Sequence, residues 1–218
     1  MSKLLFSRLS ILVLLLAAVA GCKTAGGGSS TGTRILQPGA PGQDTRTIST
    51  AQATDLSKVG ATAADIKFMQ GMIGHHAQAV EMVALIADRT ANPDMKKLGL
   101  RIQISQDDEM NMMRRYLSDR GAAVPGPHAH HEPGGFMPGM LTPEEMTQLA
   151  NAKGVEFDRL FLQGMIKHHG GAISMVEDLF KTPGAAQEGG IFAFASDVDA
   201  DQRMEIDRMG AMLKEIMK

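Results

Sequence analysis

Two adjacent histidine pairs are the residues of this chain whose types and spacing could do chemistry. His75-His76 and His168-His169 occupy the same place in two copies of one motif, DIKFMQGMIGHHAQAVEMV (65–83) and DRLFLQGMIKHHGGAISMV (158–176), which agree at 11 of 19 positions. A buried imidazole without a partner costs about 1–3 kcal/mol. Four imidazoles on apolar helix faces therefore need compensating partners, and a metal ion would supply one. Core histidines that bond to their neighbours are the alternative.

A methionine precedes each pair by about one helical turn. Met72 stands three and four residues before the first pair, and Met165 stands likewise before the second, so each thioether shares a face with an imidazole. Soft thioether ligands select Cu(I), whereas imidazole also accepts Cu(II) or Zn(II). The pattern predicts a site for copper, with zinc as the second possibility. The alternative is that both methionines only fill the core, as methionine commonly does.

A fainter repeat follows each histidine motif. Gln106-x-x-Glu109 matches Gln202-x-x-Glu205 at an offset of 96. A carboxylate on the inward face could orient an imidazole N–H, or it could bind a harder metal directly. A charge on the helix surface is the equally weighted alternative.

The segment between the two halves is rich in glycine, proline and further metal-binding residue types. It reads PGPHAHHEPGGFMPGM over residues 125–140. Histidine-rich tracts bind metals readily, so we expect weak metal capture there, against the alternative of a merely polar connection. The residues concerned are His128, His130, His131, Met137 and Met140.

Apolar residues at spacings of three and four predict helices around these motifs, as Phe68, Met72, His75, Ala79 and Met82 illustrate. No sustained strand pattern is present. The sequence therefore predicts an all-α fold over 61–218, a four-helix bundle of two similar helical hairpins (62–118 and 153–217) joined by a linker over 119–142. The expected helices span about 62–89, 93–118, 153–181 and 187–216, with a short extra turn near 143–151.

The N-terminal segment predicts export. Residues 1–21 carry a positive start and an apolar run too short for an ordinary membrane span, and they end in Val-Ala-Gly before Cys22. This sequence pattern is typical of a bacterial lipoprotein signal peptide that is cleaved before a lipidated cysteine. Residues 22–60 then form a flexible tether. The predicted location is the cell envelope, facing the periplasm, with the outer membrane favoured where the cell has one.

Composition excludes several classes of function. The formal net charge is −2 with 22 basic and 24 acidic residues, so no basic excess favours nucleic acid. Aromatic residues make up 4%, which leaves few stacking platforms. The single cysteine forms no disulfide within the chain and no thiolate zinc site.

The repeated F-x-x-G-M-I-x-H-H-x-x-A-x-x-M, with Q-x-x-E-[MI]-x-x-M after each copy, resembles the domain of unknown function 305 family over residues 62–217. The resemblance implies a ferritin-like four-helix bundle, export from the cytoplasm and, for some members, copper binding. The likeness to ferritins stops at the fold. Their di-iron centres need Glu-x-x-His motifs, and Met72 and Met165 stand where those glutamates would be.

The leading hypothesis is a membrane-tethered, extracytoplasmic copper-binding protein that sequesters copper or hands it to a partner protein. We expect its affinity to fall below about pH 6, because free imidazoles protonate near 6.5. A metal-dependent redox enzyme, such as a cuprous oxidase, is the second hypothesis. A metal-free envelope interaction module is the third.

Overall fold

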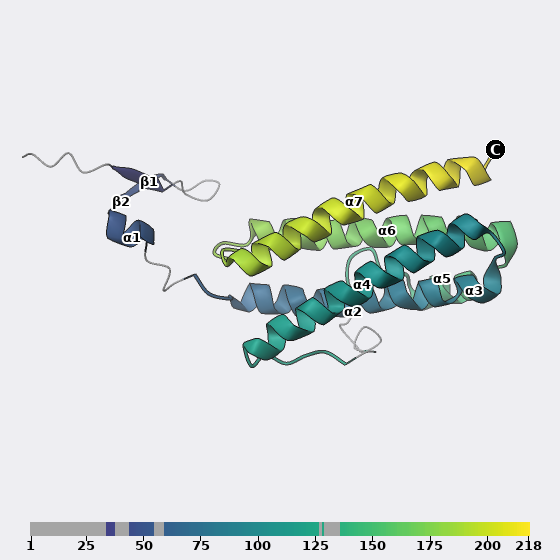
Figure 1. Cartoon of the computed structure of the whole chain (residues 1–218), viewed down its shortest axis with the longest axis horizontal. Helices are drawn as coiled ribbons and strands as arrows, with labels where there is room; N and C mark the ends of the chain where they lie inside the picture. The colour runs from purple at the N-terminus through teal and green to yellow at the C-terminus, as the bar shows by residue number, and fades with distance from the viewer. Residues whose placement is uncertain (1–33, 38–43, 55–58, 127, 129–135) are drawn as a thin grey trace, which may run out of the picture.

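The structure, a computed structural model, describes residues 34–37, 44–54, 59–126, 128 and 136–218. Its long helices are α2 (Ala63–Ala84), α4 (Pro93–Asp119), α6 (Gly154–Lys181) and α7 (Gly189–Ile216). α2 and α4 form one hairpin, α6 and α7 form the other, and α2 joins the two by contacting α6 (Figure 1). The predicted all-α class is confirmed, while the closer likeness to ferritin-like bundles stays a prediction.

Local chemistry fixes where the long helices begin. Thr62 caps α2 through a reciprocal pair of hydrogen bonds with Asp65, and the side chain of Asn92 accepts from the Asp94 amide at the start of α4. Short helices complete the hairpins: α3 (Ile86–Arg89) follows a break at Leu85, and α5 (Pro143–Asn151) precedes α6. The single helix expected over 62–89 is therefore two helices.

Two aspartates at equivalent positions of the repeats connect the hairpins through hydrogen bonds. Asp65 of α2 accepts a hydrogen bond of 2.7 Å from the backbone N–H of Ala186, in the turn before α7. Asp158 of α6 accepts one of 2.9 Å from the side chain of Asn92, in the turn before α4. Each repeat thus holds the loop of the other, as expected if the duplicated sequences pack around an approximate twofold axis.

The N-terminal region contains elements that the sequence pattern did not predict. β1 (Ile35–Gln37) and β2 (Arg46–Ile48) pair antiparallel, and α1 (Thr50–Thr54) follows them. Strands of three residues are too short to show an alternating pattern, which is why this segment was expected to be an unstructured tether. The predicted signal peptide and Cys22 lie outside the described residues.

The apolar core is divided into two clusters, one toward each end of the histidine-bearing helices. One cluster contains Phe68 and Phe194, and the other contains Phe157 and Phe161. The histidines are buried as well, although they are polar. Within the described part of the chain, no helix combines the length and apolar character needed to cross a membrane.

Candidate metal centre

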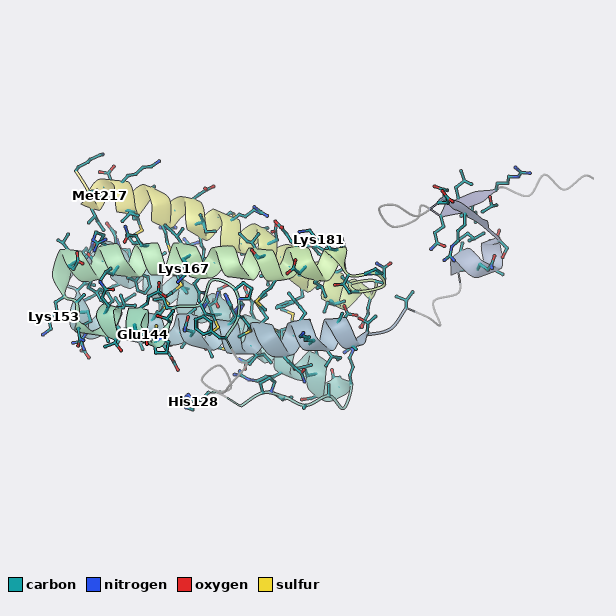
Figure 2. All side chains as sticks on the ribbon, turned by 180° about the vertical axis from the view of Figure 1, so that it is seen from behind. His128, Glu144, Lys153, Lys167, Lys181 and Met217 are labelled. Carbon is teal, nitrogen blue, oxygen red and sulfur yellow. The ribbon has the colours of Figure 1, made fainter. Side chains whose placement is uncertain are left out.

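The four paired histidines meet between the two hairpins and are almost completely buried. His75, His76 and His169 are 0% exposed, and His168 is 1% exposed. The rings of His75 and His168 come from different repeats, yet their centroids lie 3.8 Å apart. In Figure 2 the labelled Lys153 and Lys181 lie at opposite ends of α6, and Lys167, the neighbour of His168, lies between them. The packing of α2 against α6 therefore brings together the histidines of both repeats.

The second histidine of each pair bonds to a glutamate. His76 Nε2 lies 2.5 Å from Glu109 Oε2, and His169 Nε2 lies 2.6 Å from Glu205 Oε2. These are the carboxylates of the fainter repeat, contributed by α4 and α7. The second oxygen of Glu109 accepts from the Ser105 hydroxyl at 3.1 Å. A carboxylate that fixes an imidazole N–H is the usual outer support of a metal-binding histidine.

The first histidine of each pair bonds to a backbone carbonyl. His168 Nε2 lies 3.0 Å from the carbonyl oxygen of His75, and His75 Nε2 lies 3.0 Å from that of Pro138. Carbonyls and carboxylates accept hydrogen bonds but never donate them. Each Nε2 therefore carries a proton, and a neutral ring in this tautomer has its lone pair on Nδ1.

All four Nδ1 atoms are buried without a hydrogen-bond partner among the described residues. They are the imidazole ligand atoms that the hydrogen bonds leave available, and an uncompensated buried acceptor is costly. In the described part of the chain, no three His, Cys, Asp or Glu side chains are already arranged as a ligand set.

The first histidine of each pair, His75 or His168, is here called the inner histidine, and the second, His76 or His169, the outer histidine. Burial keeps the inner histidines neutral. It lowers the pKa of His75 to about 3, with the neighbouring His76 and His169 adding to the effect. Burial also holds the pKa of His168 well below its usual range, and the surrounding imidazoles act in the same direction. The expectation that metal affinity falls below about pH 6 assumes imidazoles that protonate near 6.5, and these two rings do not. The pH dependence of the affinity itself stays a prediction.

Burial alone would raise the pKa of Glu109. The hydrogen bond from His76 and the electrostatic attraction between the two side chains outweigh it, and the Ser105 hydroxyl helps, so the pKa of Glu109 is lowered. This carboxylate is therefore ionised at neutral pH, and it can hold the ring of His76 as an acceptor.

The other predicted residues are distributed differently. Met72 and Met165 are fully buried in the two apolar clusters, and Gln106 and Gln202 are buried as well. His128 lies at the periphery with its side chain 76% exposed (Figure 2). His130 and His131 lie outside the described residues.

The end of the linker is packed rather than free, in contrast to the flexible connection expected. Residues 137–141, here called the strap, pass between the repeats. Leu141 exchanges two backbone hydrogen bonds with the Gln78 side chain, at 2.8 and 2.9 Å, and Met140 is 1% exposed. A Cβ on Gly171 would lie 1.9 Å from the carbonyl oxygen of Pro138, so only glycine admits the strap there. The strap supplies the carbonyl that orients His75.

Met82 and Met175, which reach across the repeats, were not among the residues predicted to bind metal, whereas Met137 was. A Cβ on Gly71 would lie 3.2 Å from Met137 Sδ and 3.3 Å from Met175 Cε. At the equivalent Gly164, Met82 Cε occupies the corresponding place at 3.3 Å. Met82 and Met175 are identical in the two motifs, a signal that could have identified them. Thioethers therefore lie about one helical turn from the inner histidines.

The fold and the site define an all-helical protein with a duplicated histidine–carboxylate centre between two hairpins. The sequence profile of the family described as "Domain of unknown function (DUF305)" matches residues 65–213. The chain belongs to this family.

Solved structures with the same fold support this membership. The chain is 30% identical to the "putative secreted protein DUF305" of Streptomyces coelicolor, with a TM-score of 0.62, covering 70% of this chain and 93% of that one. It is 25% identical to CopM in its Cu(II)-bound form, with a TM-score of 0.56, covering 69% of this chain and 96% of CopM. CopM has also been solved with silver bound.

A viral protein shares a shorter segment. The chain is 41% identical over 56 residues to the uncharacterized protein L153 of Acanthamoeba polyphaga mimivirus. The match covers 26% of this chain and 37% of L153.

Proposed function

We propose that this chain is an extracytoplasmic metal-binding lipoprotein that sequesters copper or hands it to a partner protein. The observation that carries the proposal is the set of four buried Nδ1 atoms without a hydrogen-bond partner among the described residues, on rings whose Nε2 atoms each face an acceptor. Imidazoles fixed in this way are prepared to bind a metal without first losing a proton.

The choice of copper rests on the donor types. Imidazole and thioether together favour Cu(I), and Met137 and Met175 bring thioethers to within one turn of His75. CopM, a structural neighbour, has been solved with Cu(II) and with silver, which supports a preference for soft or borderline cations. The centre would hold the metal through Nδ1 of the inner histidines, while Glu109 and Glu205 orient the outer ones.

Export is the second part of the proposal. The signal-like residues 1–21 and Cys22 support a lipid-anchored protein at the cell envelope. The description of the Streptomyces coelicolor neighbour is consistent with a location outside the cytoplasm. Lipid-modified Cys22 in the mature protein, found by mass spectrometry, is the expected result, and an intact N-terminus would contradict it.

An anaerobic Cu(I) titration against a chromophoric chelator tests the metal site. The informative variant carries His75→Gln and His168→Gln. Glutamine places an N–H close to the position of Nε2, so the hydrogen bonds to the carbonyls of Pro138 and His75 are retained, but it has no lone pair at the position of Nδ1. We expect tight binding by the parent and a loss of at least about 100-fold, roughly 2.7 kcal/mol, in the variant.

The matched control is His128→Gln, which removes an exposed imidazole outside the centre and should leave the affinity unchanged. Circular dichroism confirms that each variant is folded. Full affinity in the folded double variant would move the site to the linker or the methionines. No tight binding by the parent would favour the metal-free interaction module instead.

A further inference from the structure

A groove of about 490 Å³ lies between α4 and α7, on the side of the bundle where the histidine-bound glutamates reside. Its lining includes Ser105 and Ile104 from α4, and Asp201, Met204 and Glu205 from α7. Glu205 holds the buried His169. Ser105 donates to Glu109, which in turn holds the buried His76. A cation in the groove would thus be separated from His169 by one carboxylate, and from His76 by the Ser105 hydroxyl and the Glu109 carboxylate.

Two other cavities described in the structure lack this connection. One, of about 170 Å³, is bordered by Glu145 and Lys167, which are paired to each other at 2.7 Å. The other, of about 400 Å³, is bordered by Asp207 and Lys214. Neither lining includes a side chain that is hydrogen-bonded to the histidines. Of the three cavities, only the α4–α7 groove is lined by a side chain that is hydrogen-bonded to one of the buried histidines.

Asp201 gives this groove a carboxylate of its own. It stands one helical turn before Glu205, and burial, together with the negative charges of Glu109, Glu205 and Asp197, raises its pKa. Glu109 and Glu205 are each held by a histidine, whereas no hydrogen bond or ion pair of Asp201 is found among the described residues. A cation would relieve the repulsion among these carboxylates.

A soft donor stands nearby on the same helix. Met204 follows Asp201 by three residues and is 63% exposed, so its thioether is open to solvent beside the groove. Arg101 and Arg208 line the groove as well, so its total charge is nearly balanced. Attraction of a cation is therefore a local effect of the carboxylate and the thioether, not of a long-range field.

We propose that the α4–α7 groove is the route by which a soft cation reaches the buried histidines, with Met204 and Asp201 as its transient ligands. The inference rests on the proposed function, because it requires a metal site at the histidines. It assigns a kinetic role to residues outside the repeated motif. A transient ligand accelerates loading and release together and leaves the equilibrium affinity unchanged.

The test measures the rate at which the purified protein removes Cu(I) from a coloured chelate, in a stopped-flow instrument under nitrogen. We expect Asp201→Asn and Met204→Leu each to slow loading by about tenfold. The release rate should fall by the same factor, so that the dissociation constant changes less than twofold. Controls are Asp207→Asn, in a different cavity, and Met112→Leu, which alters an exposed methionine of α4.

A steric variant tests the route independently of charge. Ile104→Trp should obstruct the groove and slow loading, whereas Leu100→Trp, one turn earlier on α4 and similarly exposed, should not. Unchanged rates in Asp201→Asn, Met204→Leu and Ile104→Trp, with a parent that binds tightly, would overturn the inference alone. A lasting loss of affinity in Asp201→Asn would overturn it too, since a permanent ligand is not a transient one. A parent that binds no Cu(I) would overturn the proposed function as well.

Discussion

His76 and His169 have equivalent hydrogen-bond partners in the two repeats, whereas His75 and His168 do not. Each outer histidine donates to the glutamate of its own hairpin, at 2.5 and 2.6 Å. Of the inner pair, His168 donates to the backbone of the opposite repeat, while His75 donates to the strap. The duplicated sequence thus fixes the outer pair symmetrically, and the linker makes the inner pair unequal.

The cause of this inequality lies at one pair of equivalent positions. The first repeat has Gln78 where the second has Gly171. The Gln78 side chain forms two hydrogen bonds with the backbone of Leu141, and Gly171 leaves room for the carbonyl of Pro138. The strap therefore contacts the two repeats differently: the first repeat binds it through Gln78, and the second leaves space for it at Gly171. The difference between Gln78 and Gly171 at this equivalent position is what allows the strap to pack between the repeats.

The largest expected effect is on stability at acid pH, and it tests the inner pair. Below about pH 6.5 the unfolded chain binds a proton on each inner imidazole, while folded His75, with its pKa near 3, does not. Since the unfolded state then binds more protons, the free energy of unfolding falls as pH falls. We expect about 1.4 kcal/mol per pH unit for each such histidine, measured by urea denaturation of the metal-free protein between pH 7 and 5.

Variants separate this contribution from general acid effects. His75→Gln should remove its share of the slope, and His128→Gln, at an exposed site, should leave the slope intact. A flat profile for the parent would mean that the inner histidines take up protons without unfolding.

The next effect concerns the strap. In Gly171→Ala the new Cβ meets the carbonyl oxygen of Pro138 at 1.9 Å, so the strap must move and His75 loses its acceptor. We expect the free energy of unfolding to drop by about 2–3 kcal/mol. Gly170→Ala is the matched control. Nothing lies within 4 Å of its Cβ, so it should gain about 0.5–1 kcal/mol from helix propensity. Equal stabilities of the two variants would show that the strap does not bind this surface in solution.

The outer pair should respond symmetrically. Glu109→Ala and Glu205→Ala each leave a buried imidazole N–H without its acceptor, which costs about 1–3 kcal/mol. Because the two histidine contacts are equivalent, the costs should differ only by the hydrogen bond that Glu109 alone accepts from Ser105, about 0.5–1.5 kcal/mol. Glu→Gln at either site keeps an acceptor oxygen and should cost less. A large difference between the two alanine variants in thermal unfolding would refute the equivalence.

Much of this centre could be predicted from the sequence, and what could not has a physical explanation. The repeat identified His75, His76, His168 and His169, because periodic apolar spacing places them on inward faces. Helix starts followed from caps such as Thr62 and Asn92. These are local properties of the chain.

The missed features depend on contacts between distant segments. Pro138 lies 63 residues from His75, and its carbonyl has no side-chain signature. Met175 reaches Gly71 only because α6 packs on α2. The short pair of strands was not predicted, because strands of three residues are too short to show an alternating pattern of apolar residues. Tertiary packing, not local propensity, decides each of these features.

The smallest expected effect compares the two motif glycines. In Gly71→Ala the new Cβ meets Met137 Sδ and Met175 Cε, at 3.2 and 3.3 Å, and both are ends of flexible side chains that can yield. Gly71→Ala should therefore be neutral or slightly stabilising, because helix propensity favours alanine by up to about 1 kcal/mol. In Gly164→Ala the nearest atom is Leu141 Cδ2, at 3.1 Å, and Gln78 fixes the backbone of that residue. Gly164→Ala should thus be the less stable of the two by about 1 kcal/mol or less, as measured by urea denaturation. The reverse order would indicate that the methionine side chains over Gly71, not the Leu141 side chain over Gly164, are the rigid part of the centre.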